Sequence, residues 1–252
     1  MKKYKRIKIW INLMRCYFMS FRGSKAIILN SQETIEYLIK ENKSLIRFGD
    51  GEFNLFLKKD IHYQKWSYKL LEDIKMIKEY FEDNKENSEY ILAVPYIFLK
   101  KSGLFLARRR VYVSSWSFAR YIFKNNFTNK NIRYGDSFAF SINSGNTKDK
   151  LFSNTKDAIF VHNNKKYSDN FFRLYNRKTY FVQCSNKNAY EEIDKLLKSI
   201  DICIKENKLD KKNLDIIISA GPAGKVIAFK MSKKGYRCLD TGHCWDEPLI
   251  ID

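Results

Sequence analysis

The sequence predicts one Rossmann-like α/β domain, with a mostly parallel β-sheet and helices on both faces. Short runs of β-forming residues alternate along the chain with segments whose apolar residues recur at helical spacing. The last such stretch, residues 214–239, has the pattern strand, glycine turn, helix and strand, which is a βαβ unit. The chain has 252 residues and only three prolines, so it fits a single domain without a proline-rich linker.

The individual elements follow from local patterns between residue 31 and the C-terminus. Ser31 is expected to cap a first helix, and apolar residues recurring from Leu70 to Phe81 indicate a second. The predicted strands are residues 44–48, 90–94, 158–161, 179–183, 214–219 and 236–239. Residues 108–113 are expected to form a further strand, and residues 115–126, 189–204 and 225–234 three more helices. Gly235 is expected to end the last helix.

Residues 1–30 are predicted to be a basic N-terminal extension, and residues 31–252 the domain itself. Residues 1–25 contain eight lysines and arginines and no acidic residue. Read as a helix, this segment places Ile7, Ile11, Met14 and Phe18 on one face. Its apolar part is too short to span a bilayer, which takes roughly 20 residues. The segment can lie on an anionic membrane surface, or pack on its own domain or a second subunit.

Charge and cysteine content limit the classes of function. The net charge of +19 favours an anionic partner, although a composition rich in lysine and asparagine explains it equally well. No RNP-like motif, zinc-finger spacing or basic heptad array accompanies the charge, so nucleic acid is not an expected partner. The five cysteines are scattered and form no CxxC pair. We therefore expect reduced thiols in a cytoplasmic protein.

The first segment that can carry chemistry is Arg47-Phe48-Gly49-Asp50-Gly51-Glu52, at the end of a predicted strand. In parallel sheets, ligands bind beyond the carboxyl ends of the strands. Asp50 and Glu52 can face one Mg²⁺ or Mn²⁺ ion, which prefers carboxylate oxygens together with substrate phosphates. Gly49 and Gly51 leave room for a ligand, and Arg47 adds positive charge. An ordinary Asp-Gly turn and the acid–base pair of a hydrolase are the alternatives.

The second segment is Gly221-Pro222-Ala223-Gly224, which precedes the helix expected to start at Lys225. Backbone amides at a helix N-terminus bind anions, so a diphosphate fits here with help from Lys225. A tight strand-to-helix connection is the alternative. Neither a GxGxxG fingerprint nor a P-loop is present. Asp240, at the end of the next strand, leaves open a nicotinamide-dependent oxidoreductase in which it binds a ribose.

Of the three histidines, only His243 follows the end of a predicted strand, in the segment Asp240-Thr241-Gly242-His243. It is a candidate metal ligand, phosphate contact or catalytic base. His62 and His162 receive no role from the sequence.

These segments together resemble a known family. Arg47-Phe48-Gly49-Asp50-Gly51-Glu52-Phe53 followed by Gln64 resembles the signature of the GT-D glycosyltransferases. Gly221-Pro222-Ala223-Gly224, Lys233-Lys234-Gly235-Tyr236 and Asp240-Thr241-Gly242-His243 resemble the closing block of the same family. The resemblance extends from about Ser31 to His243. Two stretches differ from the pattern: Ile142 and Asn143 stand where an arginine is expected after residues 134–141, and Cys244-Trp245-Asp246 follows the histidine.

The resemblance implies a single Rossmann-like domain that transfers a hexose from a nucleotide sugar, a UDP-hexose, to an acceptor glycan. It also implies that Asp50 and Glu52 hold a Mn²⁺ or Mg²⁺ ion, with Asp50, Glu52 and His243 as catalytic residues. Arg47, Gly49, Gly51, Gly221, Pro222, Gly224 and Lys225 are then the expected donor-binding residues. Such enzymes act in bacterial surface polysaccharide or glycoprotein assembly, on acceptors linked to lipid or protein. A basic protein that binds nucleic acid or membrane through charge alone is the non-enzymatic alternative.

Overall fold

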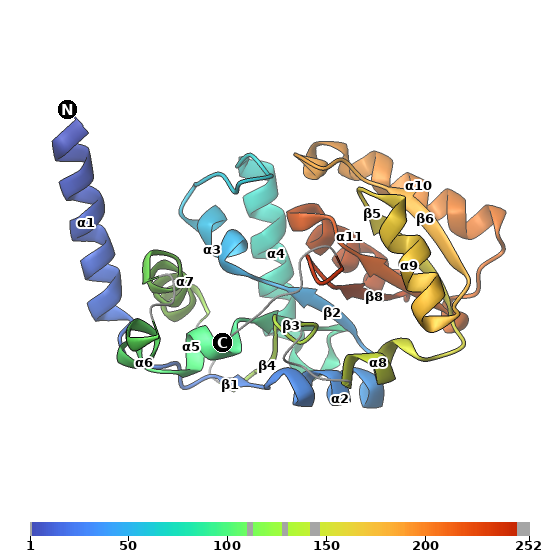
Figure 1. The fold of residues 1–252 in the computed structure, drawn as a ribbon, viewed down its shortest axis with the longest axis horizontal. Coiled ribbons are helices and arrows are strands. Elements are labelled where there is room, and N and C mark those ends of the chain that lie inside the picture. Colours follow the sequence, from blue (N-terminus) through green and yellow to red (C-terminus); the bar gives the residue numbers. More distant parts are fainter. Residues whose placement is uncertain (1, 110–112, 128–130, 142–146, 246–252) are drawn as a thin grey trace.

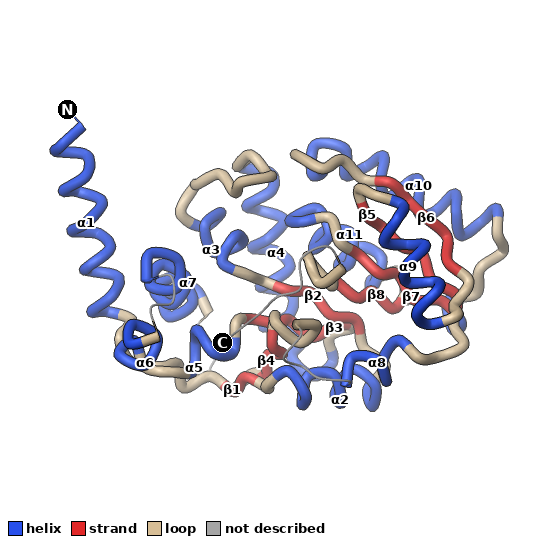
Figure 2. Tube along the Cα trace, in the orientation of Figure 1, coloured by secondary structure: helices blue, strands red, loops and turns tan. Residues whose placement is uncertain are grey.

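The computed structural model describes residues 2–109, 113–127, 131–141 and 147–245. Its centre is an eight-stranded sheet in the order β1-β4-β3-β2-β8-β7-β5-β6, in which every recorded pairing is parallel (Figures 1 and 2). The strands are β1 (Ile27–Ile28), β2 (Ser44–Arg47), β3 (Tyr90–Val94), β4 (Arg133–Asp136), β5 (Asp157–His162), β6 (Thr179–Gln183), β7 (Leu214–Ile218) and β8 (Arg237–Asp240). The predicted fold class is therefore confirmed.

The central strands are buried along their whole length, as expected for a parallel sheet covered on both faces. Every residue of β2, β3, β7 and β8 is buried. Their apolar side chains belong to one continuous core that also takes in the inner sides of the helices. Hydrophobic burial on both faces fixes the positions of the strand ends, and with them the loops that follow.

Helices cover the two faces of the sheet in separate layers. α4 (Tyr68–Asn84), α11 (Gly221–Lys233) and α10 (Ile193–Glu206) contact one another in sequence on one face. On the opposite face, α2 (Ser31–Glu41) contacts α8 (Thr147–Phe152), and α9 (Lys165–Tyr175) covers β5 and β6 (Figure 1). The remaining helices and 3₁₀ turns are α1 (Lys2–Met19), α3 (Asp50–Phe56), α5 (Tyr96–Lys100), α6 (Gly103–Arg108), α7 (Val113–Asn126), η1 (Lys85–Asn87), η3 (Ala189–Glu192) and η4 (Lys211–Asn213).

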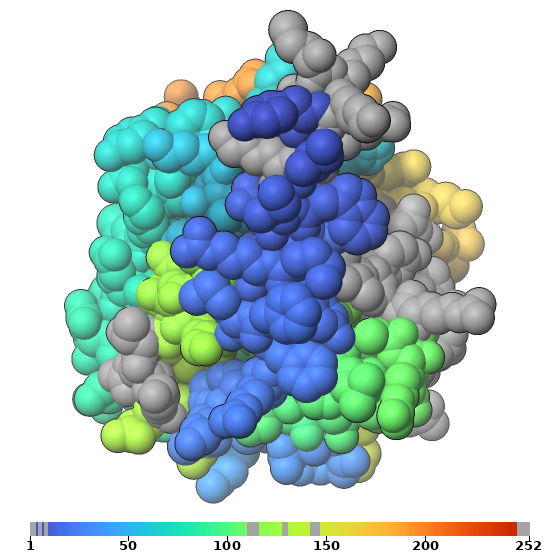
Figure 3. Space-filling view, turned by 90° about the vertical axis from the view of Figure 1, so that its left-hand side faces the viewer, coloured from blue at the N-terminus to red at the C-terminus, as the bar shows by residue number. Residues whose placement is uncertain are grey.

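The helix α1 lies at one end of the molecule, beyond the sheet, and packs on α7 (Figures 1 and 3). The ring of Tyr17 contacts that of Trp116, with centroids 5.6 Å apart. Arg120 of α7 donates from Nε to the carbonyl of Ser20 at 2.6 Å, and Lys124 donates to the carbonyl of Met19 at 3.0 Å. Within the described part of the chain, no helix is both long enough and apolar enough to span a membrane.

Several boundaries differ from the predicted ones for identifiable reasons. The N-cap of α2 is Asn30, not Ser31, because Asn30 and Glu33 form a reciprocal capping box with bonds of 2.9 and 2.8 Å. The strand expected over residues 108–113 is wrong at both ends, since Arg108 ends α6 and Val113 begins α7, while residues 110–112 lie outside the described residues. The residues of the expected turn at 221–224 instead form the first turn of α11.

Two strands were not predicted at all. Both β1 and β4 are short, and in β4 only Tyr134 is a strong β-former beside Arg133, Gly135 and Asp136. Burial of Tyr134, packed on Phe81 and Phe123, makes this segment a strand. Since β1 pairs with β4, the sheet already includes residues of the segment 1–30 that was expected to be an extension.

Candidate functional site

A cavity of about 470 Å³ lies where the chain leaves the carboxyl ends of the strands. Its size is that of a small-molecule site. Its lining comes from the loops after β2, β4, β5, β6, β7 and β8, and from the segment between α3 and α4. The lining residues are Arg47, Gly49, Asp50, Gly51, Glu52, His62, Tyr63, Gln64, Ser137, Phe138, His162, Asn163, Cys184, Ser185, Asn186, Lys187, Ala189, Ser219, Ala220, Gly221, Pro222, Lys225, Gly242 and His243.

The cavity brings together both glycine-containing segments and His243, which are far apart in the sequence. Of the predicted site residues, only Gly224 does not line it. A Cβ atom on Gly224 would lie 2.9 Å from Cγ2 of Ile218 in β7. Gly224 therefore allows α11 to pack closely on the sheet, which is the structural role left open for this segment.

The two carboxylates after β2 have different environments. Asp50, the first residue of α3, is exposed, and its Oδ1 accepts a hydrogen bond from the amide of Gly51 at 3.0 Å. Glu52 is buried, and its Oε2 accepts from the amide of Gly49 at 2.8 Å. Glu52 is the third residue of α3, so this bond satisfies an amide at the helix N-terminus. Asp50 is thus accessible to a ligand, whereas Glu52 is held in the wall.

Lys225 connects Glu52 to the end of β8. Its Nζ lies 3.4 Å from Oε1 of Glu52 and 3.2 Å from Oδ2 of Asp240, and all three side chains are buried. Burial lowers the pKa of Lys225, but Asp240 and Glu52 together outweigh it, so the pKa lies above its ordinary value of 10.5. Lys225 is therefore a charged ammonium between two carboxylates, and not a mobile side chain at the cavity mouth.

Asp240 is fully buried, and the oxygen that contacts Lys225 has a second donor. Its Oδ2 also accepts from the amide of Arg47 at 3.0 Å. A ribose-binding carboxylate has to reach its ligand, and Asp240 does not line the cavity. The arrangement therefore speaks against the nicotinamide-dependent oxidoreductase.

Arg47 and Gly242 form the wall between β2 and β8. The guanidinium of Arg47 donates from Nη1 to the carbonyl of Thr241. Gly242 has φ +57°, and a Cβ atom there would lie 2.2 Å from Nη1 of Arg47. Glycine is required at this position both for the backbone conformation and for the guanidinium.

Tyr63 lies between the two segments. Its ring contacts that of His243 edge to face, with centroids 5.5 Å apart. A Cβ atom on Gly221, which has φ +53°, would lie 2.7 Å from Cε2 of Tyr63. Burial, Glu52, Asp50 and Asp240 raise the pKa of Tyr63 to about 12, against a smaller lowering by Lys225. The phenol stays protonated at neutral pH and can donate a hydrogen bond.

Carboxylate oxygens are the groups of this site that could hold a divalent cation. Among the described residues, Oε1 of Glu52 and Oδ1 of Asp240 are buried carboxylate oxygens without a hydrogen-bond donor. No group of three or more His, Cys, Asp or Glu side chains stands ready to hold a metal in the part of the chain that the structure describes. Mg²⁺ is commonly held by one or two carboxylates together with substrate phosphates. Asp50 and Glu52 fit that pattern, provided the substrate supplies further oxygens.

Several lining residues were missed by the sequence reasoning. His62 and His162, to which it gave no role, both line the cavity. The side-chain amide of Asn163 donates from Nδ2 to Oδ1 of Asn186 at 2.8 Å on the far wall. Asn163 directly follows β5, and Asn186 lies after β6. Polar residues after strand ends were the available signal, but the order of strands in the sheet was needed to place them together.

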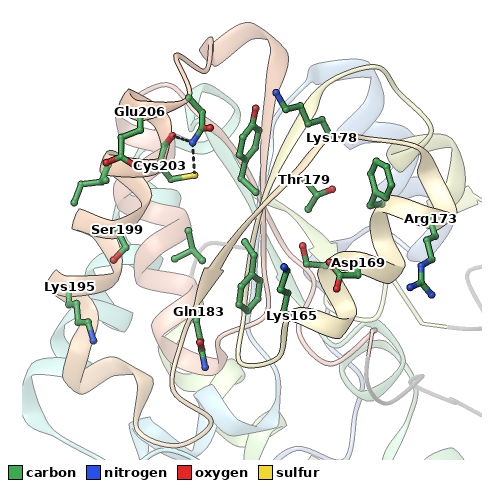
Figure 4. Close-up of a pocket in the computed structure, with 17 residues that line it drawn as sticks. Lys165, Asp169, Arg173, Lys178, Thr179, Gln183, Lys195, Ser199, Cys203 and Glu206 are labelled. Carbon is green, nitrogen blue, oxygen red and sulfur yellow. Dashed lines mark hydrogen bonds between the residues drawn. The ribbon is translucent and has the colours of Figure 1, made fainter.

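A second, larger hollow of about 1180 Å³ lies elsewhere, along the edge strand β6 between α9 and α10 (Figure 4). Lys165, Asp169 and Arg173 line it from α9, and Lys195 lines it from α10. None of the predicted site residues borders it. It lies along the side of a strand and not beyond the strand ends, so the smaller cavity remains the candidate site.

Comparisons with known proteins show the family of this chain. The family described as glycosyltransferase GT-D fold matches residues 45–247. A probable glycosyl transferase, Gly, of Streptococcus gordonii is 23% identical over 234 residues, which are 86% of this chain and 32% of the relative. Glycosyltransferase GlyD of Streptococcus pneumoniae is 23% identical over 236 residues, 84% of this chain and 26% of the relative. The chain thus spans about a third or less of the length of these relatives.

Solved structures show the same fold. A conserved domain of unknown function, 1792, described as having a distinct glycosyltransferase fold, superposes with a TM-score of 0.68 at 21% identity, covering 95% of this chain and 83% of that one. A glycosyltransferase with this domain from Streptococcus sanguinis gives a TM-score of 0.68 at 23% identity, covering 88% and 83%. The matched family covers both segments that form the cavity and most of the sheet between them, and the chain belongs to the GT-D glycosyltransferase family.

Proposed function

We propose that this chain transfers a hexose from a nucleotide sugar, a UDP-hexose, to an acceptor glycan, and that the reaction depends on Mn²⁺ or Mg²⁺. One observation carries the proposal. The exposed carboxylate of Asp50, the buried carboxylate of Glu52 and the N-terminus of the 13-residue helix α11 line a single cavity beyond the strand ends. A diphosphate needs both kinds of group, because backbone amides bind its oxygens and a carboxylate-held cation balances its charge.

The charges of the wall favour a metal ion over direct binding of the diphosphate by lysine. Around Lys225, the carboxylates of Glu52 and of the buried Asp240 stand against the cations of Lys225 and Arg47, and Asp50 adds a third carboxylate at the cavity mouth. Lys225 is already matched by two carboxylates. A diphosphate adds further negative charge to a wall that has no positive excess, so a divalent cation is the group that makes binding favourable.

Asp50 and Glu52 would hold the ion, which would supply Lewis-acid stabilisation of the charge that develops on the diphosphate as the bond between the sugar and the diphosphate breaks. The protein's own residues orient the donor and hold the wall in place. In the first turn of α11, the amides of Gly221 and Ala223 are the groups offered to the diphosphate, because Pro222 has no N–H and the amide of Gly224 donates to the carbonyl of Ala220 at 3.3 Å. The ion pair of Glu52 with Lys225 joins α3 to α11 and so helps to hold Asp50 at the cavity mouth.

The acceptor hydroxyl has to lose a proton during transfer, and His243 is our candidate for this role. Its side chain is exposed at the rim, and its ring is held against Tyr63. An exposed imidazole can take up a proton from an acceptor that enters from solvent. On the far wall, Asn163 and Asn186 offer amide groups suited to sugar hydroxyls.

We place the reaction in the cytoplasm, at the inner face of the membrane, in the assembly of a bacterial surface polysaccharide or glycoprotein. The resemblance to GT-D enzymes supports this biological setting. All five cysteines are free thiols, which suits a reducing compartment. The acceptor is then a glycan linked to lipid or to protein.

A thermal-shift screen tests the donor and the metal together. UDP-, GDP- and TDP-hexoses are added with and without Mn²⁺, and the melting temperature is measured. A ligand at about 100 times its Kd stabilises the native state by about 2.7 kcal/mol. We expect a rise with a UDP-hexose and Mn²⁺ that exceeds the rise with either alone. A GDP- or TDP-hexose acting best would overturn the choice of nucleotide, and no response to any donor would overturn the proposed activity.

A further inference from the structure

The helix α1, which lies in the foreground of Figure 3, exposes a row of large apolar side chains. They recur at alternating steps of three and four residues, and Trp10 widens the row. The exposed fractions are 78% for Tyr4, 50% for Ile7, 64% for Trp10, 62% for Ile11, 42% for Met14 and 68% for Phe18. We call these six residues the outer row. Such a contiguous apolar patch is unusual on a protein surface and indicates a binding surface.

The outer row is not the side by which α1 packs on its own domain. Cys16 is buried, as is Ser20 just beyond the helix, and both lie on the opposite side of the helix from Ile11 and Phe18. Ser20 and Met19 are held by Arg120 and Lys124 of α7 through their carbonyls. The domain therefore fixes one side of the helix and leaves the other side uncovered. The helix thus packs on its own domain, as the sequence left open, but in the part of the chain that the structure describes the outer row remains exposed.

Positive charge accompanies the outer row. The helix contains Lys2, Lys3, Lys5, Arg6, Lys8 and Arg15 and no acidic residue. Arg22 and Lys25 follow directly, and both are exposed. Beside Phe18, the side chains of Arg22 and Lys124 border a shallow surface hollow. Anionic headgroups attract such lysines and arginines, while the apolar side chains enter the boundary between headgroups and acyl chains.

We propose that α1 docks the protein on an anionic lipid surface through the outer row. A second copy of the chain is the competing occupant, because steps of three and four residues also make a coiled-coil seam. That seam covers only about two heptads, fewer than a coiled coil needs. Lys8 and Arg15 would flank it, and in a pair of identical helices these positions would oppose like charges. An anionic membrane turns the same charges into an attraction.

This docking would hold the enzyme at the surface where a lipid-linked acceptor is presented. It concerns a different part of the molecule from the cavity and needs no assumption about the reaction. Failure of the docking and failure of the proposed activity can therefore be measured separately.

The test is co-sedimentation of the whole chain with vesicles of phosphatidylcholine alone, or of phosphatidylcholine with about one third phosphatidylglycerol. The row variant carries Ile7→Ser, Ile11→Ser and Phe18→Ser, which keep every charge. The control variant carries Phe172→Ser, Leu174→Ser and Ile202→Ser, which remove three apolar side chains of similar exposure from α9 and α10. Circular dichroism and size-exclusion chromatography with light scattering report on folding and oligomeric state.

We expect the wild type and the control variant to bind the anionic vesicles, with binding that falls steeply as salt is added. Binding of the row variant should be about a hundredfold weaker, because three large side chains no longer enter the lipid. Equal binding of the row variant and the wild type, or no binding of the wild type, would overturn the proposal. So would a wild-type dimer that the row variant abolishes, since the second copy would then be the occupant.

Discussion

Replacing Lys225 by methionine tests whether the ion pairs of the cavity wall are as buried as the structure indicates. The substitution keeps a long flexible side chain and removes one positive charge. It leaves Glu52 and Asp240 as buried carboxylates without their common partner. Removing one member of a buried ion pair costs about 3–5 kcal/mol, because the remaining charge stays desolvated.

A matched control lies on the same helix. Lys233 pairs with Glu89 at 2.8 Å, but its side chain is 39% exposed and that of Glu89 is 37% exposed. Lys233→Met should therefore cost no more than about 1 kcal/mol. For a chain of this size, 1 kcal/mol corresponds to about 2–4 °C in melting temperature. A difference of about 3 kcal/mol between the two variants thus predicts about 6–12 °C.

Urea unfolding and thermal melting of both variants, followed by circular dichroism, measure this difference. The raised pKa of Lys225 also makes the stability difference between the wild type and Lys225→Met depend on pH. The stability that depends on a raised pKa is fully present below the ordinary value of 10.5 and is lost as the pH rises through the folded-state value. The gap between wild type and Lys225→Met should therefore persist from pH 7 to pH 10. Equal stability of Lys225→Met and Lys233→Met would refute the reasoning.

Three further predictions concern the same cavity. Gly221→Ala should weaken donor binding at least tenfold and destabilise the fold by about 1–3 kcal/mol, because φ is +53° and the new Cβ would meet Tyr63. Gly235→Ala is the control for backbone strain alone, since Gly235 has φ +86° and no atom would lie closer than 3.8 Å to the new Cβ. Titration with donor and urea unfolding measure both variants. Between pH 10 and 12 the free energy of unfolding of the wild type should fall by up to about 2.7 kcal/mol relative to that of Tyr63→Phe, because tyrosine ionises near pH 10 in the unfolded chain and near pH 12 in the fold. Unfolding with the same pH dependence in both proteins would contradict the burial of Tyr63. Glu52→Ala should abolish UDP release from a UDP-hexose in a coupled UDP assay, and full activity of this variant would remove the proposed role of Glu52. The variant should also have a lower melting temperature, because Glu52 accepts a hydrogen bond from the amide of Gly49 and pairs with Lys225.

The sequence predicted the strands in which β-forming residues follow one another without a break. β3 and β6 were placed at their observed ends, and β7 within one residue, because unbroken runs of β-forming residues mark strands of a covered sheet. β4 was missed because this segment forms a strand only through the packing of Tyr134 on residues far away in the sequence. The order of the strands did not follow from local patterns either. It is the pairing of β2 with β8 that brings Arg47 beside Asp240.

Much of the candidate site was predicted, but not the role of each residue. Asp50 and Glu52 were expected to act alike, yet one is exposed and the other is fixed by Gly49 and Lys225. This difference depends on Lys225, which lies 173 positions further along the chain and could not be paired with Glu52 from spacing. Of the two stretches that depart from the family pattern, Ile142, Asn143 and Asp246 lie outside the described residues.

Metal-dependent binding of UDP at Asp50 is the claim on which the proposed function depends. Isothermal titration of UDP into the wild type, Asp50→Asn and Asp169→Asn, each with and without Mn²⁺, tests it most directly. Asp169 lines the larger hollow at β6, so its variant controls for the loss of one carboxylate elsewhere. The account predicts that the wild type and Asp169→Asn bind UDP only with Mn²⁺, and that Asp50→Asn binds at least tenfold more weakly. Binding of equal strength by Asp50→Asn, or binding that does not respond to Mn²⁺, would contradict it.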